Sequence, residues 1–374
     1  MNILIDGRPF VAPSAGITNF LRGSLTAWAI QRPHDEFMVA MPHERHATLD
    51  MTDIPDNIRF ISYTNQLLRR LPNLLWLCLT FPLLSRSLKA DAYYSALPGL
   101  PFLLPRRMKK MIVVHDVVNL EFKETMQWTN VLSNKLFFNR SVRKADIIWA
   151  NSNYTRAKVE QYFPQRRCQD LFTGCAVNRS IYHALPLSDS EKADIREKHG
   201  IEGRFILFVG SLEPRKNLSF LLSLMPELYG RHQIQLVVVG GHGWKNSSVS
   251  QLVNAADFPK ESTVFCGFIT NEELASLYNL ADCFVSTSLN EGFGMPQLEA
   301  MQCGCPVVTA HNSAMIEVAE GKSGAITVEG YNPQDWIDAI CKTIANRPVV
   351  DQQQLTEYDW NQIVDRLIPR LYRP

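Results

Sequence analysis

Short apolar runs alternate with helix-like segments along the whole sequence, and this alternation limits the fold more than any other feature. The runs predict strands at Asn2–Asp6, Phe37–Met41, Ile58–Ser62, Ala92–Ser95, Met111–His115, Ile147–Ala150, Phe205–Val209, Ile234–Val239, Val264–Gly267, Cys283–Thr287 and Pro306–Thr309. Most of them have the nearly continuous Val, Ile and Phe content of a strand buried on both faces. Such alternation favours an α/β fold in which helices cover both sides of parallel sheets.

The segments between the runs show the 3.6-residue period of helices. Leu274, Leu277 and Tyr278, for example, fall on one helical face. Thr270 and Glu273 stand just before that face at the spacing of a capping box. The strand runs are therefore separated by helices rather than by long loops.

A chain of 374 residues is expected to form about two domains. We interpret the polar stretch 178–203 as the linker between them. The prediction is two Rossmann-like domains, residues 1–180 and 204–350, that face each other across a cleft. Ligands of such sheets bind at the carboxyl ends of the strands.

The composition is that of an ordinary globular protein, with 46% hydrophobic and 20% charged residues. The net charge of +1 gives no reason to expect a nucleic-acid partner. The 8 cysteines include no C-x-x-C pair, which favours reduced thiols in a cytoplasmic protein. The first residues lack the apolar region of a signal peptide, and the longest apolar run, 71–84, is too short to span a membrane.

The run from Asn290 to Ala300 carries the strongest functional signal. It places Glu291 and Glu299 on either side of a turn that contains Gly292 and Gly294. Glycines let the backbone approach a ligand closely, and the N–H groups at a helix start form an anion site. Two carboxylates flanking an anion site suit the sugar, diphosphate and ribose of a nucleotide-sugar. The alternative is an ordinary strand–turn–helix connection with two solvated glutamates.

This run matches E-G-F-G-x-P-x-x-E-A and resembles the signature of retaining glycosyltransferases of the GT-B fold, most closely glycosyltransferase family 4. The resemblance implies that Glu291 contacts the donor sugar and that Glu299 accepts hydrogen bonds from the ribose. It also implies that Gly292, Phe293 and Gly294 lie along sugar and phosphate. In this family the last helix, here residues 360–371, packs back on the first domain.

A second motif follows the predicted strand Phe205–Val209. Lys216 matches the family lysine that holds the donor diphosphate, and a fixed cation would stabilise the charge of the leaving group. Many relatives have Arg immediately after the strand's glycine, where this chain has Ser211. Arg215 is our candidate for the missing charge. The alternative is that Arg215 and Lys216 form a solvated helix start.

Further candidates come from the same resemblance. Gly241 allows close approach of nucleotide or sugar, and Phe268 with Ile269 matches the turn at which main-chain groups contact the base. In the first domain, Gly16 is the close-approach residue of a loop near the donor phosphate. His115, at the carboxyl end of its predicted strand, matches a histidine that reaches the donor sugar.

We therefore expect a retaining, metal-independent glycosyltransferase that moves a hexose to a hydroxyl of a glycan or lipid-linked acceptor. The preferred donor is GDP-mannose, with UDP-hexoses as the alternative. No Asp-x-Asp pair occurs in the sequence, so no metal site is expected, and no cofactor beyond the sugar-nucleotide substrate. A nucleotide-sugar epimerase and a non-catalytic nucleotide-sugar-binding subunit are the rival functions.

The segment 67–110 adds a hypothesis of membrane contact. Its apolar run 71–84 includes Trp76 and Phe81, which suit a membrane interface, and cations flank it on both sides. These cations are Arg69, Arg70, Arg86, Lys89, Arg106, Arg107, Lys109 and Lys110. Such a segment fits peripheral docking on the anionic inner face of the cytoplasmic membrane. The alternative is a core helix between two strands.

Overall fold

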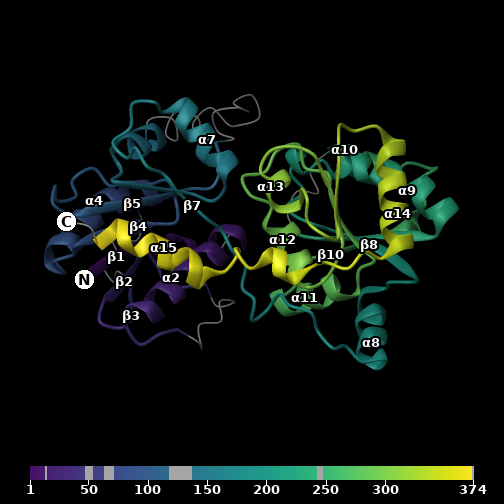
Figure 1. The fold of residues 1–374 in the computed structure, drawn as a ribbon, viewed down its shortest axis with the longest axis horizontal. Coiled ribbons are helices and arrows are strands. Elements are labelled where there is room, and N and C mark those ends of the chain that lie inside the picture. Colours follow the sequence, from purple (N-terminus) through teal and green to yellow (C-terminus); the bar gives the residue numbers. More distant parts are fainter. Residues whose placement is uncertain (13–14, 47–53, 63–70, 118–136, 242–246, 373–374) are drawn as a thin grey trace. The chain divides into compact units, whose positions relative to one another are not determined.

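The computed structural model describes residues 1–12, 15–46, 54–62, 71–117, 137–241 and 247–372. The chain forms two compact units (Figure 1). Unit 1 contains Met1–Val177 together with Tyr358–Pro374, and unit 2 contains Asn178–Glu357. Among the described residues, no helix combines the length and apolar character needed to cross a membrane.

Unit 1 is built on a seven-stranded parallel sheet with the strand order β3-β2-β1-β4-β5-β6-β7. Its strands are β1 (Asn2–Asp6), β2 (Glu36–Met41), β3 (Ile58–Ser62), β4 (Ala92–Ser95), β5 (Lys109–Val114), β6 (Ile147–Ala150) and β7 (Phe172–Thr173). The first six confirm the strands expected from the sequence, apart from small shifts at their ends. The two-residue β7 was not predicted.

Helices cover this sheet. They are α1 (Arg8–Val11), α2 (Ala15–Gln31), α4 (Asn73–Ser87), α7 (Asn153–Tyr162) and α15 (Trp360–Tyr372). The inner face of α4 places Trp76 and Phe81 in the core with β4 residue Tyr93, and all three side chains are fully buried. The expectation that Trp76 and Phe81 face a membrane is therefore wrong. The outer face of the same helix is exposed.

The C-terminal helix α15 packs on α2 in unit 1. The Trp360 ring meets the Phe20 ring edge-on, with centroids 5.0 Å apart, and also meets Trp149. A Cβ at Gly23 would overlap the indole of Trp360. The absence of a side chain at position 23 is what allows the indole to lie against α2.

Unit 2 contains a six-stranded parallel sheet with the order β10-β9-β8-β11-β12-β13. Its strands are β8 (Arg204–Val209), β9 (Ile234–Val239), β10 (Thr263–Gly267), β11 (Cys283–Ser286), β12 (Val307–Ala310) and β13 (Ala325–Val328). The edge strand β13 was not predicted. The two parallel sheets confirm the α/β class expected from the sequence.

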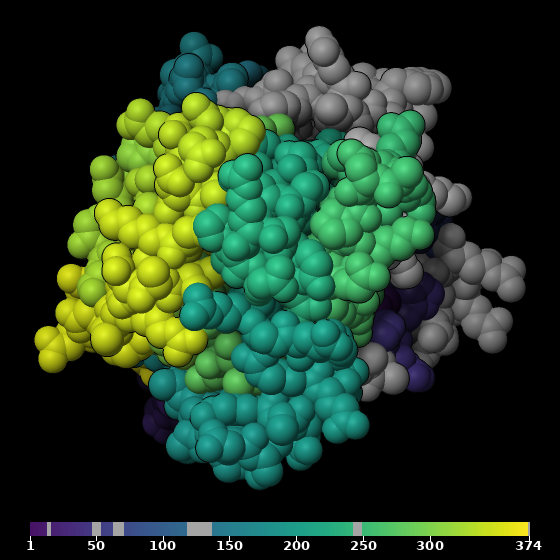
Figure 2. Space-filling view, turned by 90° about the vertical axis from the view of Figure 1, so that its right-hand side faces the viewer, coloured from purple at the N-terminus to yellow at the C-terminus, as the bar shows by residue number. Residues whose placement is uncertain are grey.

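The helices of unit 2 are α8 (Asp189–His199), α9 (Leu218–His232), α10 (Ser247–Val253), α11 (Asn271–Leu280), α12 (Met295–Gln302), α13 (Met315–Ala319) and α14 (Pro333–Asn346). Helix α8 lies within the stretch interpreted as a linker, and this stretch belongs to unit 2. Teal residues of this part of the sequence form the lower surface in Figure 2. A capping box of Ser188 and Glu191 starts α8, and left-handed Gly200 ends it. Its polar sequence reflects solvent exposure, not the absence of structure.

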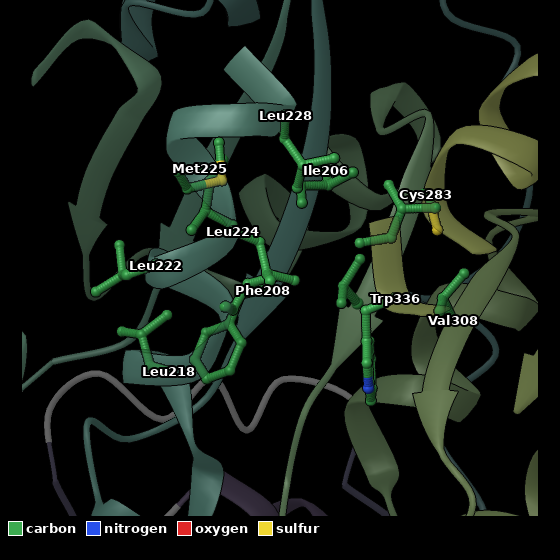
Figure 3. Packing of buried hydrophobic residues seen from close by; sticks show 14 of the residues in the cluster. Ile206, Phe208, Leu218, Leu222, Leu224, Met225, Leu228, Cys283, Val308 and Trp336 are labelled. Atoms are coloured by element: carbon green, nitrogen blue, oxygen red, sulfur yellow. The ribbon is translucent and has the colours of Figure 1, made fainter. Parts of the chain in front are cut away.

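The core of unit 2 fills the space between α9, the sheet and α14 (Figure 3). Leu221 and Leu228 of α9 and Trp336 of α14 are fully buried there. The Trp336 indole N–H donates to the carbonyl of Gly330 at 3.0 Å, so the largest core side chain has its polar atom satisfied. This packing fixes the sheet whose carboxyl edge carries the candidate site.

Candidate active site

The carboxyl ends of β8, β9 and β10 come together at glycines. The Gly240 N–H donates to the carbonyl of Gly267 at 2.8 Å, and the Gly210 N–H donates to that of Val239 at 2.9 Å. Gly240 has φ +134°, and a Cβ there would overlap the Gly210 carbonyl. Only glycine fits this position, because the main chains that follow β8 and β9 meet there.

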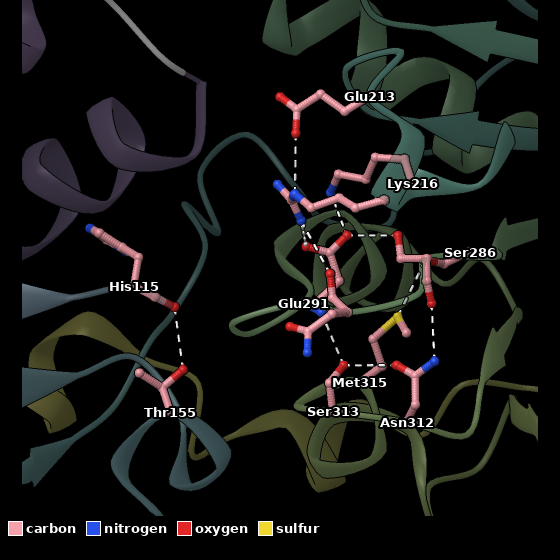
Figure 4. Close-up of polar contacts among 12 residues, drawn as sticks. His115, Thr155, Glu213, Lys216, Ser286, Glu291, Asn312, Ser313 and Met315 are labelled. Atoms are coloured by element: carbon pink, nitrogen blue, oxygen red, sulfur yellow. Dashed lines mark hydrogen bonds and ion pairs between the residues drawn. The ribbon is translucent and has the colours of Figure 1, made fainter. Parts of the chain in front are cut away.

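Glu291 lies at the same edge, in the loop between β11 and α12 (Figure 4). One of its carboxylate oxygens, Oε1, pairs with Lys216 Nζ and accepts from Ser288 Oγ at 2.7 Å. The other, Oε2, pairs with Arg215 at 2.9 Å. Glu291 and Lys216 are both buried, and Arg215 is half-buried, so one carboxylate is shared by two cations with little access to water.

This cluster keeps Glu291 ionised. Burial alone would raise the pKa of Glu291, but the charges of Lys216 and Arg215 outweigh burial and lower it to about 2. Its backbone N–H also donates to Ser313 Oγ at 3.0 Å. The carboxylate is therefore an anion near neutral pH and is held in place by its partners.

Backbone contacts tie the loops after β8 and β11 together. The Leu289 N–H donates to the carbonyl of Arg215 at 2.7 Å, and Thr287 Oγ1 donates to that of Lys216 at 3.2 Å. Arg215 also pairs with Glu213 at 3.1 Å. A solvated helix start is therefore the wrong description of Lys216, because the lysine is a buried member of a fixed cluster.

Glu299 lies one turn inside α12, as the sequence predicted. Gly294, with φ +93°, precedes the helix, and Pro296 occupies its first turn. Glu299 is buried and its Oε2 accepts from the Tyr278 hydroxyl at 3.1 Å. Burial raises the pKa of Glu299 to about 7, and the Tyr278 hydrogen bond opposes this rise. The alternative of two solvated glutamates is wrong, because both are buried.

The remaining candidates of unit 2 lie in the turns around these carboxylates. Phe268 is 71% exposed, and a Cβ at Gly241 would overlap its ring. The exposed Phe268 ring lies beside the Gly241 backbone, so it offers a flat surface on which an aromatic ring of a ligand could stack. Ile269 is half-buried, whereas Phe293 is buried. Gly292 lies between Glu291 and Phe293 and is also buried.

In unit 1, His115 follows β5 at the carboxyl edge of its sheet. Its Nε2 lies 2.8 Å from the Ala96 carbonyl, so this nitrogen carries the proton. The ring meets Phe20 edge-on at 4.9 Å. Burial lowers the pKa of His115, which makes it a neutral hydrogen-bonding group. Gly16 is the second residue of α2.

Two further groups of unit 1 have structural explanations. Arg8 forms a two-pronged ion pair with buried Asp6, at 2.9 and 2.7 Å, which ties the first loop to the end of β1. Ser152 caps α7 by accepting from the Thr155 N–H at 2.9 Å. Asn151 is different, because its side-chain oxygen is buried without a partner among the residues that the structure describes.

Sequence reasoning missed the groups that hydrogen-bond to the two glutamates. Ser288 and Ser313 bind Glu291, and Tyr278 binds Glu299. The helical period places Tyr278 on the buried face of its helix and gives it no further role. Ser313 has a left-handed backbone, φ +49°, but no local sequence pattern marks it. Ser313 and Tyr278 stand 22 and 21 residues from the glutamates they contact, whereas Ser288 stands only three residues before Glu291.

Residues 191–359 match the family described as glycosyl transferases group 1. O-antigen chain mannosyltransferase B of Escherichia coli is 30% identical over 273 residues, which cover 71% of this chain and 66% of that protein. The serotype-specific mannosyltransferase WbdA of Escherichia coli is 28% identical over 237 residues, 62% of this chain, but this chain spans only 28% of its length.

Among solved structures, the Anabaena protein Alr3699/HepE in complex with UDP-glucose has a TM-score of 0.72 and 18% identity. The match covers 99% of both chains. At this identity the likeness concerns the fold, which is the GT-B fold.

Proposed function

Because the chain belongs to the glycosyl transferases group 1 family, we propose that it transfers a hexose from a nucleoside diphosphate sugar to a hydroxyl, with retention of the anomeric configuration. The observation that carries this proposal is the ion-pair cluster of Glu291, Lys216 and Arg215, in which Glu291 and Lys216 are buried. It lies at the carboxyl edge of a parallel sheet, beside the start of α12. Ligands of open α/β sheets bind at such edges.

Lys216 and Arg215 hold the diphosphate of the donor. The ammonium group of Lys216 has three donors, so it can keep Glu291 and still donate to a phosphate oxygen. As the bond to the sugar breaks, negative charge develops on the diphosphate and fixed cations stabilise it. No metal is needed in this arrangement. The departing diphosphate takes the proton of the attacking hydroxyl, which approaches from the same face.

The other candidates have separate roles in this proposal. Glu291 contacts the donor sugar, and Gly292, Phe293 and Gly294 lie along sugar and phosphate. Glu299 accepts hydrogen bonds from the ribose, since charged acceptors bind hydroxyl donors strongly.

The base and the far side of the sugar have their own contacts. Gly241, Phe268 and Ile269 contact the base. Gly16 and the neutral imidazole of His115 serve the donor from unit 1.

We propose GDP-mannose as the donor and a glycan or lipid-linked acceptor in cell-surface polysaccharide synthesis. Support comes from the two mannosyltransferase relatives, one of which is named for the O-antigen chain. A UDP-hexose is the second candidate, because the Anabaena structure of similar fold contains UDP-glucose. The curated relatives match this chain over only part of their length, so their substrates serve as support and not as identification.

Calorimetric titration of the chain with GDP-mannose, UDP-glucose, UDP-galactose and ADP-glucose tests the donor. Tight binding of GDP-mannose alone is expected, and preference for a UDP-sugar would replace it. Turnover should require an added acceptor, whereas turnover of donor alone into a new nucleotide-sugar would indicate an epimerase. Proton NMR of the first product decides retention, because an inverted anomeric signal would contradict the mechanism.

A further inference from the structure

The outer face of α4 is apolar although it is exposed. Leu75, Leu79 and Leu83 follow one another at four-residue spacing and are 52%, 52% and 58% exposed. Residues four apart lie on the same side of a helix, so the three side chains form one stripe. The inner side of the helix is already packed on the core. The stripe is therefore a second apolar surface that unit 1 does not use.

The loop between β4 and β5 extends this stripe. Phe102 and Leu103 are 54% and 68% exposed. The backbone of Phe102 forms a hydrogen bond with the thiol of Cys78. Cys78 lies on α4 one residue before Leu79, so the loop is next to the helix. The guanidinium of Arg140 lies over the Phe102 ring at 4.2 Å, which holds the ring in this position. Five of the ten large hydrophobic residues exposed in the described chain lie in these two neighbouring segments.

Cations surround the end of this apolar surface. Arg86, Lys89, Arg106 and Arg107 are exposed, and none of the ion pairs within the described ranges uses them. Lys89 and Arg107 line one pocket of about 480 Å³, so the end of α4 and the β4–β5 loop are adjacent. Between residues 71 and 108 the only acidic residue is Asp91. We call the five apolar residues and these four cations the α4 face.

We propose that the α4 face lies on an anionic phospholipid bilayer. Leucine and phenylalanine side chains enter the boundary between headgroups and acyl chains, and the four cations contact the lipid phosphates. The charge of the surface selects this partner, because unpaired cations beside an apolar stripe complement an anionic interface. Arg69 and Arg70 were part of the hypothesis from the sequence, but they lie outside the described residues. The proposal rests on the α4 face alone. Membrane binding goes beyond the proposed function, and it can be measured without turnover.

Co-sedimentation with vesicles tests the inference. The full chain should bind phosphatidylcholine vesicles that contain about 30 mol % phosphatidylglycerol, and bind pure phosphatidylcholine vesicles much less. Raising the salt to about 0.5 M should weaken binding, because exposed charges are then screened. Replacement of Arg86, Lys89, Arg106 and Arg107 by Gln should weaken binding at low salt on the order of 10²–10³-fold.

The apolar stripe needs its own variant. Leu75→Ser, Leu79→Ser and Leu83→Ser together should weaken binding on the order of 10²-fold, since each side chain is half-exposed before docking. Ile30→Ser, at another exposed apolar residue of unit 1, is the matched control. For the cations, the control replaces exposed Arg204, Arg231, Lys260 and Lys342 of unit 2 by Gln. Both controls should bind like the native chain.

Three outcomes overturn the proposal. The first is absence of binding to the anionic vesicles at low salt. The second is equal loss of binding in the α4-face variants and their controls, because general charge or general instability would then explain it. The third is a dimer in solution that the Leu→Ser variant abolishes while vesicle binding is unchanged, since the stripe would then bind a second copy of the chain. Unchanged thermal melting of each variant shows that it is folded.

Discussion

Binding of the donor should depend on pH through Glu299. Burial raises the pKa of this carboxyl to about 7, from an ordinary value of 4.5. An acceptor of ribose hydroxyl bonds must be ionised to bind well, so donor binding competes with protonation. The dissociation constant of an intact nucleotide-sugar should rise about tenfold between pH 8 and pH 6, and one proton should be released on binding near pH 6.

The same shift has a cost in stability. It amounts to about 2.5 pH units, and one unit corresponds to about 1.4 kcal/mol, so ionised Glu299 opposes folding by on the order of 3 kcal/mol. The pKa of Glu299 is higher in the folded chain than in the unfolded chain, so the protonated carboxyl favours folding. This contribution to stability is fully present below pH 4.5 and is lost as the pH rises through about 7. Glu299→Gln should therefore stabilise unit 2 at pH 8 and have much less effect at pH 5.

Calorimetry in buffers of different ionisation enthalpy measures both the affinity and the proton release. The phosphates of an intact nucleotide-sugar are esterified on both sides and do not titrate in this range. Glu299→Gln should bind more weakly than the native chain at pH 8, with no pH dependence. Tyr278→Phe removes a hydrogen bond that lowers the pKa of Glu299, so its affinity should begin to fall at higher pH. A native affinity that is the same at pH 6 and pH 8 would refute the reasoning.

Three other predictions follow from the site. Lys216→Ala should lower kcat on the order of 10²–10³-fold with a smaller change in donor KM, because its charge acts mainly on the leaving group; an unchanged kcat would contradict that role. Activity should persist in excess chelator, and a complete loss that magnesium or manganese restores would show a metal requirement. Gly240→Ala places a Cβ against the Gly210 carbonyl at φ +134° and should lower the melting temperature of unit 2 by several degrees, whereas Gly230→Ala, in open space, should not.

The strands were predictable because a parallel strand buried on both faces leaves an apolar run in the sequence. Ile234–Val239 was predicted at its observed bounds, and all six of its residues are buried. The missed strands lack this property. The edge strand β13 is mostly half-buried, and β7 has only two residues. Partial burial alone does not hide a strand, because the edge strands β3 and β10 are also incompletely buried and were predicted. The missed strands are also short, with four residues in β13 and two in β7, and short runs give a weak pattern.

The positions of the site carboxylates were also predictable, since glycines and a proline mark the turn around them. The ion pair that Glu291 forms with Lys216 was not predictable from the sequence. Glu291 and Lys216 are separated by 75 residues, and the buried pair forms only because the sheet brings two loops together. The two faces of α4 show the same limit. The sequence shows that the helix is apolar, but packing on the sheet decides that Trp76 is buried and Leu79 exposed.

The position of α15 affects the order in which the protein folds during synthesis. Unit 2 is an insertion in unit 1, whose helix α15 follows unit 2 in the sequence. The pocket formed by Phe20 and Trp149 receives Trp360 only after unit 2 has left the ribosome. Unit 1 is mostly synthesised before unit 2, and yet its core is completed only after unit 2. A chain truncated before Trp360 would keep all strands of both sheets and still expose aromatic residues of the N-terminal unit to chaperones and proteases.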